Sequence, residues 1–186
     1  VVFPAKTMIA AAMNPCKCGF FPDLGKCRCT PTQIRRYLNR VSGPFLDRID
    51  IGVEVPRQDL GMMAAEKSID EGSFPQTEQR NSSAVMRARV MEARARQEKR
   101  FADESISYNS QMTRRQIEEY CRLSGEEAVF LEKVERQQGI SARGHGKTLK
   151  VARTLADLDG QAEIGRTQLA EAIGFRSFEK KYWGSL

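Results

Sequence analysis

Four cysteines crowded into fourteen residues constrain this chain more than any other feature of its sequence. They form the pattern C-x-C-x8-C-x-C and are Cys16, Cys18, Cys27 and Cys29. Four thiolates on a short loop suit tetrahedral Zn²⁺, and the basic residues between them favour the thiolate forms. The pattern therefore predicts a structural metal site, with reduced thiols or labile disulfides as the alternatives. A fifth cysteine, Cys121, stands alone and is predicted to pack inside the protein.

A buried strand is predicted directly before the cysteines. Residues 7–13 read TMIAAAM, a continuous apolar run typical of a strand covered on both faces in a parallel α/β sheet. Such a strand needs neighbours and crossover helices that the sequence scarcely offers, so we expect a fragment of a longer protein. Asn14 follows this strand, where it could orient a water or a phosphate at the edge of the sheet. The alternative is that Asn14 and Pro15 only begin a turn.

A helix and a second strand are predicted after the cysteines. Thr30-Pro31-Thr32-Gln33 is a strong helix start, and the helix should end at Ser42-Gly43-Pro44. Residues 49–55 then alternate apolar and polar side chains, the pattern of a strand. Arg48 lies just before this strand and could reach a phosphate on a neighbouring subunit. Its alternative role is an ordinary surface pair with Asp47.

The remainder of the chain is predicted to be a linker and a helical bundle. Residues 58–80 have weak periodicity and read as a linker or mobile loop. An Arg-rich helix should cover 82–101, with its apolar stripe at Ala84, Ala88, Met91 and Ala95. Four further helices are predicted from their end signals, which are Thr113, Ser124, Gly139, Ser141 and Gly174. The resulting division is an α/β segment over 1–57, a linker over 58–80 and a helical domain over 81–186.

Basic residues in the helical part suggest an anionic ligand. Arg143 lies in the first turn of the helix that follows Ser141, and its planar guanidinium could contact a nucleotide γ-phosphate. A solvated basic helix face is an equal alternative. His145 is the only histidine, so a catalytic arrangement around a second one is excluded, and we expect it to be exposed and not catalytic.

Charge and composition narrow the class of protein. The net charge of +6 allows nucleotide or nucleic-acid partners without requiring them. No apolar run approaches the roughly 20 residues of a membrane helix, so a soluble, cytoplasmic protein without a membrane partner is predicted. The chain contains no G-x-x-x-x-G-K-[ST] sequence, the loop that cradles nucleotide phosphates.

Two long stretches resemble one protein family. The first reads AAAMNPCKCGFFPD and continues, after Cys27, as RCTPTQIRRYLNRVSGPFLDRIDIGVEVPR. It is similar to the latter part of the AAA+ module of ComM/YifB-type proteins, the magnesium chelatase-like bacterial ATPases. The second comprises ISARGHGKTLKVARTLADLDG and AEAIGFRS, and it resembles that family's C-terminal helical domain. The resemblance implies an α/β remnant of an AAA+ P-loop NTPase core followed by an all-α helical lid bundle.

The resemblance also implies a role for each candidate residue. Asn14 matches the sensor-1 residue, which orients the hydrolytic water near the γ-phosphate of Mg²⁺-bound ATP. Arg48 matches the arginine finger that is offered to ATP on the adjacent subunit. Arg143 matches the sensor-2 arginine of the lid. The four cysteines match the family's cysteine pairs, for which zinc is inferred.

The implied protein is a ring-forming ATPase, a hexamer, that remodels branched or single-stranded DNA, for example by branch migration in transformation and recombination. The Walker A and Walker B segments of the family would precede residue 1, so this chain alone is expected neither to bind ATP tightly nor to hydrolyse it. One alternative is the ATPase subunit of a true magnesium chelatase, which inserts Mg²⁺ into a porphyrin. Another is a zinc-stabilised DNA-binding module without enzymatic activity, whose DNA affinity would fall steeply with salt.

Overall fold

The computed structural model describes residues 7–55 and 82–184, so the predicted linker at 58–80 lies outside the described residues. The chain divides into two compact units, which we describe separately. One contains the residues up to Leu46 and those from Glu179 onward, and the other is Asp47–Phe178. Residues 47–55, assigned above to the N-terminal domain, thus lie with the helical unit. Among the described residues, no helix has the length and apolar character needed to cross a membrane.

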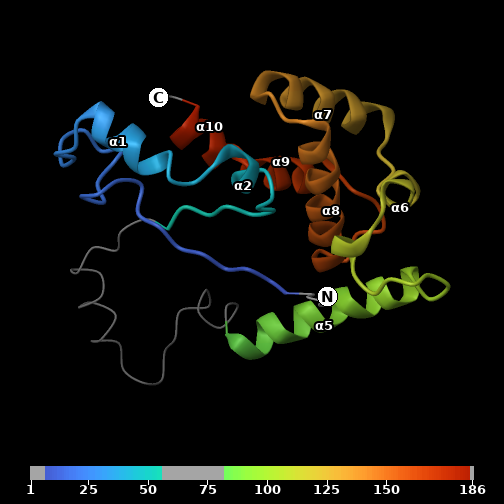
Figure 1. Ribbon diagram of the computed structural model, residues 1–186. Helices are drawn as coiled ribbons and strands as arrows, with labels where there is room; N and C mark the ends of the chain where they lie inside the picture. The colour runs from blue at the N-terminus through green and yellow to red at the C-terminus, as the bar shows by residue number, and fades with distance from the viewer. Residues whose placement is uncertain (1–6, 56–81, 185–186) are drawn as a thin grey trace, which may run out of the picture. The chain divides into compact units, whose positions relative to one another are not determined.

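The described residues are organised as helices (Figure 1). The first unit contains α1 (Pro31–Leu38) and α2 (Gly43–Leu46), and α10 (Ser177–Trp183) begins in the second unit and ends in the first. The second unit contains α5 (Ser83–Arg100), the 3₁₀ helix η1 (Asn109–Gln111), α6 (Arg114–Tyr120), α7 (Gly125–Gln138), α8 (Ala142–Leu158) and α9 (Arg166–Gly174). The predicted helical bundle is therefore confirmed.

The two predicted strands do not form, and the α/β part of the fold prediction is wrong for the described residues. Residues 7–13 and 49–55 have no strand assignment, and the described residues contain no sheet. Met8 and Ile9 are 92% and 71% exposed, so the apolar run is not buried. A strand is stable only when a neighbour pairs with its backbone groups, and neither segment has such a neighbour within residues 7–55 and 82–184.

Helix ends follow the predicted signals closely. The side chain of Thr30 caps α1 and that of Thr113 caps α6, each completing a capping box with the glutamine three residues later. Ser141 accepts a hydrogen bond from the backbone N–H of Gly144 at the start of α8. Gly139 ends α7 with φ of +70°, a conformation that favours glycine. The short helices α2 and α10 were not predicted. Ser42-Gly43-Pro44 was read only as the end of the preceding helix, whereas the Ser42 hydroxyl accepts a hydrogen bond of 3.3 Å from the backbone N–H of Phe45 at the start of α2.

Helix α8 is the centre of the second unit. It packs against α5, η1, α6 and α9 (Figure 1). The hydrophobic core around it includes Phe101, Met112, Leu131, Leu149, Ala152, Ala156, Ile164, Leu169 and Ile173. Cys121 is buried in this core, as predicted, and burial raises the pKa of its thiol to about 11.

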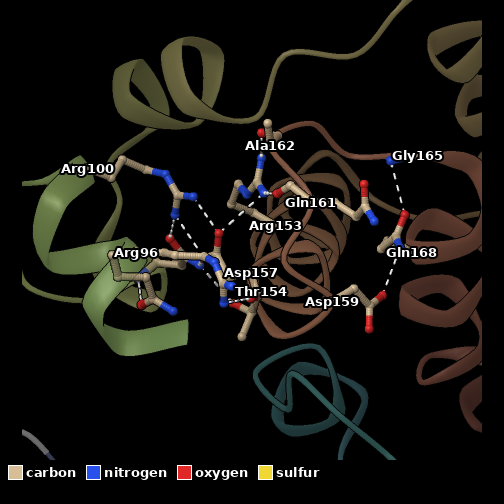
Figure 2. Close-up of polar contacts among 12 residues, drawn as sticks. Arg96, Arg100, Arg153, Thr154, Asp157, Asp159, Gln161, Ala162, Gly165 and Gln168 are labelled. Carbon is tan, nitrogen blue, oxygen red and sulfur yellow. Dashed lines mark hydrogen bonds and ion pairs between the residues drawn. The ribbon is translucent and has the colours of Figure 1, made fainter. Parts of the chain in front are cut away.

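A buried carboxylate joins α5, η1 and α8 (Figure 2). The side chain of Asp157 on α8 is fully buried and forms a two-oxygen ion pair with Arg100 of α5. It also accepts a hydrogen bond of 2.8 Å from the amide of Asn109 in η1 and pairs with Arg153 at 3.3 Å. Arg153 in turn donates to the carbonyls of Gln161 and Ala162, at 2.7 and 2.8 Å. A buried charge is tolerated when it is paired and hydrogen-bonded in this way.

Helix α5 contacts the bundle through a different face from the one predicted. Its buried residues are Ala93 and Gln97, whereas all four residues of the predicted stripe are exposed. Arg96 donates to the backbone carbonyl of Asp157 at 2.8 Å, and Gln97 accepts from the backbone N–H of Asn109 at 3.1 Å. The prediction failed because apolar spacing cannot identify a face that packs through arginine and glutamine.

A histidine–carboxylate pair joins α7 to α8. The Nδ1 atom of His145 lies 2.8 and 3.0 Å from the two carboxylate oxygens of Glu135. The hydrogen bond to Glu135 raises the pKa of His145 above 6.5, although burial opposes the shift. The histidine that we expected to be merely exposed is thus half-buried and paired.

We expect Asp157→Ala to lower the free energy of unfolding by about 3–5 kcal/mol, because it leaves buried guanidinium groups without their counter-ion. The matched control is Glu132→Ala, which removes the exposed partner of Arg136 on α7 and should cost at most about 1 kcal/mol. Urea denaturation followed by circular dichroism measures both, and Asp157→Asn serves if the alanine variant does not fold. Equal losses for Asp157 and Glu132 variants would contradict a central role for Asp157.

The His145–Glu135 pair should make stability depend on pH. Because the folded pKa of His145 is raised, its stabilising contribution is complete below about pH 6.5 and disappears as the pH rises through the folded pKa. The difference in unfolding free energy between the wild type and Glu135→Gln should therefore shrink with rising pH. A difference that stays constant from pH 5 to pH 9 would show that the ion pair contributes nothing.

Candidate functional site

The four cysteines converge at the surface of α1 in the first unit. Gly19 has φ of +78° and lets the chain turn, and its backbone N–H donates to the carbonyl of Cys16 at 3.0 Å. The side chain of Cys16 is fully buried and forms a small core with Ile34 and Leu38 of α1. Further side chains pack against this core, including those of Phe21, Tyr37, Tyr182 and Trp183. A hydrophobic contact thus holds the loop against α1.

The spacing of the sulfur atoms suits a metal ion. The Sγ atoms of all four cysteines lie within 4.8 Å of one another. Cys16 and Cys18 are separated by 3.3 Å, Cys18 and Cys27 by 3.6 Å, and Cys16 and Cys27 by 3.9 Å. A tetrahedron with Zn–S bonds of about 2.3 Å has sulfur atoms about 3.8 Å apart, whereas a disulfide bond measures about 2.05 Å. The cysteines are unbridged and could hold one tetrahedral ion.

The thiols influence one another's ionisation. The backbone N–H groups of Phe20 and Arg28 lower the pKa of Cys18 to about 6. A backbone N–H of Cys29 likewise favours the Cys27 thiolate, but burial and the neighbouring sulfurs outweigh it and raise the pKa of Cys27 to about 11. The pKa values of Cys18 and Cys27 are thus shifted in opposite directions. A divalent cation bound by the cysteines would favour the thiolate form of each.

Asn14 is exposed in the first unit, immediately before the cysteine loop. The two arginines assigned to nucleotide binding, Arg48 and Arg143, both lie in the second unit.

The segment that carries Arg48 lies against α8. Lys147 donates to the backbone carbonyl of Arg48 at 2.5 Å and pairs with the carboxylate of Asp50 at 2.9 Å. The backbone N–H of Gly52 donates to the carbonyl of Phe175 at 2.9 Å. The approach is so close that a Cβ atom on Gly52 would lie 2.2 Å from the ring of Phe178. Contacts with residues about a hundred or more positions later therefore hold this segment against the second unit.

The carboxylate of Asp47 contacts two arginines: Arg143 in the first turn of α8, and Arg176, the second residue after the end of α9. The Nε atom of Arg143 lies 3.7 Å from one carboxylate oxygen, and Arg176 lies 3.8 Å from the other. The hydroxyl of Ser141 is 3.4 Å from the Asp47 carboxylate. Arg176 also donates to the backbone carbonyl of Ile49 at 3.1 Å. Asp47, the residue that precedes Arg48, thus contacts Arg143.

Asp47 and Arg176 were not assigned site roles from the sequence. Asp47 was considered only as a surface partner for Arg48, and Arg176 was noted only within the stretch AEAIGFRS. The sequence near this site offers only Gly174-Phe175-Arg176, in which an arginine follows a helix-ending glycine and one apolar residue. That signal gives no indication that the side chain is buried or that its partner lies more than a hundred residues earlier.

Comparisons with known proteins identify the family. The model for "Magnesium chelatase, subunit ChlI C-terminal" matches residues 80–176, and that for "Magnesium chelatase, subunit ChlI" matches residues 1–63. The competence protein ComM of Haemophilus influenzae is 39% identical over 178 residues, which cover 95% of this chain and 32% of ComM. YifB of Escherichia coli is 38% identical over 180 residues, which cover 97% of this chain and 33% of YifB.

The chain spans about a third of the length of the curated relatives that it matches. The matches extend over both the cysteine-containing part and the helical part, and they confirm the resemblance inferred from the sequence. The chain belongs to the magnesium chelatase-like family and is of the ComM/YifB type.

Proposed function

We propose that this chain is the finger and lid portion of an AAA+ ATPase that uses ATP to remodel DNA. The observation that supports the proposal is that the backbone of Arg48 and the side chain of the preceding Asp47 both contact α8, the helix whose first turn contains Arg143. An arginine finger must be held by its own subunit so that it can reach the nucleotide of the next. The contacts of Lys147 and Arg176 with the segment around Arg48 supply such a hold.

The remaining assignments complete this proposal. Asn14 acts as sensor 1 and orients the attacking water, while Arg143 acts as sensor 2 and contacts the γ-phosphate of ATP. The nucleotide is bound with Mg²⁺ in a ring of subunits, a hexamer. The substrate is branched or single-stranded DNA, and the name of the relative ComM, a competence protein, favours a role in transformation. The cytoplasm is the compartment where these partners meet.

We further propose that the four cysteines hold one structural Zn²⁺. The spacing of the four sulfur atoms supports a bound dication. All four ligands come from protein, and a closed site of this kind stabilises a fold and leaves no position for a substrate. The zinc thus supports the loop that follows Asn14 and takes no part in hydrolysis.

ATP hydrolysis by the intact protein tests the arginine assignments. Arg48→Ala should lower kcat by about 10³-fold, the usual effect of losing an arginine finger, with little change in nucleotide affinity. Arg143→Ala should weaken nucleotide binding as well, because its guanidinium contacts the bound phosphate. The matched control is Arg136→Ala, an exposed arginine of α7 whose partner is Glu132.

Three outcomes would redirect the proposal. Unchanged hydrolysis in the Arg48 and Arg143 variants would remove both assignments. Stimulation of the intact protein by a porphyrin, and not by DNA, would favour a true magnesium chelatase. DNA binding by the isolated chain that weakens steeply with salt, in an intact protein without ATPase activity, would favour a DNA-binding module.

Metal analysis of the purified chain tests the zinc site. We expect about one zinc per chain, released as the pH falls because protons compete for the thiolates. Cys27→Ser should lower the zinc content, whereas Cys121→Ala should not, since Cys121 lies in the core of the other unit. Absence of zinc from chain purified without chelator and supplied with the metal would contradict the proposal.

A further inference from the structure

Positive charge is concentrated in the first unit. Its described residues, 7–46 and 179–184, include eight lysines and arginines but only two acidic residues, which gives a net charge of +6. The described residues of the second unit, 47–55 and 82–178, include 18 basic and 17 acidic side chains, a net charge of +1. Four thiolates around one Zn²⁺ would lower the charge of the first unit only to +4. The first unit therefore attracts polyanions, and the second is nearly neutral.

The basic side chains of the first unit can be reached from solvent, because all eight of them are exposed. Within residues 7–55 and 82–184, four of these side chains form no ion pair or hydrogen bond, namely those of Lys17, Arg28, Arg36 and Arg40. The buried face of α1 carries Ile34 and Leu38, and Arg36 lies on the opposite face. The cysteine loop and the outer face of α1 thus present cations that an anionic partner can bind.

The tip of the cysteine loop also presents an apolar side chain, because Leu24 is 81% exposed. Asp23 fixes the turn around it: its backbone carbonyl accepts from the N–H of Cys27 at 2.8 Å, and its carboxylate accepts from the N–H of Gly25 at 3.1 Å. A single exposed leucine needs no explanation by itself. This leucine, however, lies at a hydrogen-bonded turn between the two cysteine pairs of a strongly cationic unit, so the loop offers positive charge and an apolar group together.

Nucleic acid is the partner that this combination fits. Its phosphates are bound by exposed lysines and arginines, and apolar side chains such as leucine insert between its base steps and unstack them. Unstacking costs least where bases are already unpaired, as at a junction or a fork. An acidic protein surface would pair with the same cations, but it has no stacked bases for Leu24 to enter.

We propose that the cysteine loop and α1 form a DNA-binding surface, in which Arg36 and Arg40 contact phosphates and Leu24 contacts bases at a junction. The four cysteines, with the metal proposed for them, hold the loop that presents Leu24. This inference rests on the proposed function, because it takes DNA as the substrate of the intact protein.

Binding of a labelled forked DNA duplex to the intact protein, with a non-hydrolysable ATP analogue present, tests the basic residues. Fluorescence anisotropy between about 50 and 200 mM salt gives the slope of log affinity against log salt. Arg36→Ala/Arg40→Ala should make this slope shallower by about 2 for each subunit that contacts the DNA, because each lost phosphate contact removes about 0.9. The matched control is Arg115→Ala/Arg122→Ala, which removes two exposed arginines of the second unit and should leave the slope unchanged.

Leu24 gives an independent readout. Leu24→Ala should weaken binding of the forked duplex by up to about tenfold, because burial of the leucine side chain is lost, and it should leave the salt slope unchanged. Leu24→Met keeps a large apolar side chain and should bind like the wild type. The matched control is Val129→Ala on α7, which shortens an exposed apolar side chain of the second unit. Zinc content and circular dichroism identify any variant whose loop is no longer folded.

The results distinguish failure of this surface from failure of the proposed function. An intact protein that binds neither forked nor single-stranded DNA would remove the proposed function. If the protein binds DNA but Arg36→Ala/Arg40→Ala has the salt slope of the wild type, the DNA-binding surface is overturned and the proposed function stands. Equal binding of the fork by Leu24→Ala and the wild type overturns the contact of Leu24 with the bases.

Discussion

The second unit depends on the buried carboxylate of Asp157. That group lies where α5, η1 and α8 meet, and it receives Arg100, Asn109 and Arg153 (Figure 2). Because α5 has so few buried residues, apolar contact alone cannot define its position on the bundle. The hydrogen bonds from Arg96 and Arg100 to Asp157 define the position of α5 on the bundle. These contacts hold α8 in place, and the first turn of α8 contains Arg143, which contacts Asp47.

The ion pairs of Asp157 and Asp47 hold the two ends of α8 with different strength. Removing a partner from a buried ion pair costs about 3–5 kcal/mol, whereas an exposed pair contributes about 0–1 kcal/mol. Asp157 is fully buried near the C-terminal end of α8, and Asp47 contacts exposed Arg143 near its N-terminal end.

Features encoded in a few adjacent residues were predictable from the sequence, and features encoded by distant contacts were not. The caps at Thr30, Thr113 and Ser141 were predicted because each cap and its partner lie within three residues. The cysteine cluster was predicted for the same reason. The segment 49–55 was predicted to be a strand because its apolar and polar side chains alternate. Alternation shows only that the two faces of a segment differ in polarity, and it does not identify what each face contacts. Its actual partners lie on α8 and after α9, and spacing along the chain carries no information about them. The burial of Arg176 could likewise not be predicted, because arginine side chains usually lie at the protein surface.

The two units also differ in how they achieve stability. The second unit has a continuous core of more than ten buried side chains around α8. The small core around the cysteine loop contains three buried residues, Cys16, Ile34 and Leu38, with aromatic side chains partly covering them. Domains with so little buried apolar area usually require a disulfide or a metal, and the cysteines are unbridged. A dication bound by all four cysteines would close the loop, so the proposed metal is better understood as part of the fold than as an addition to it.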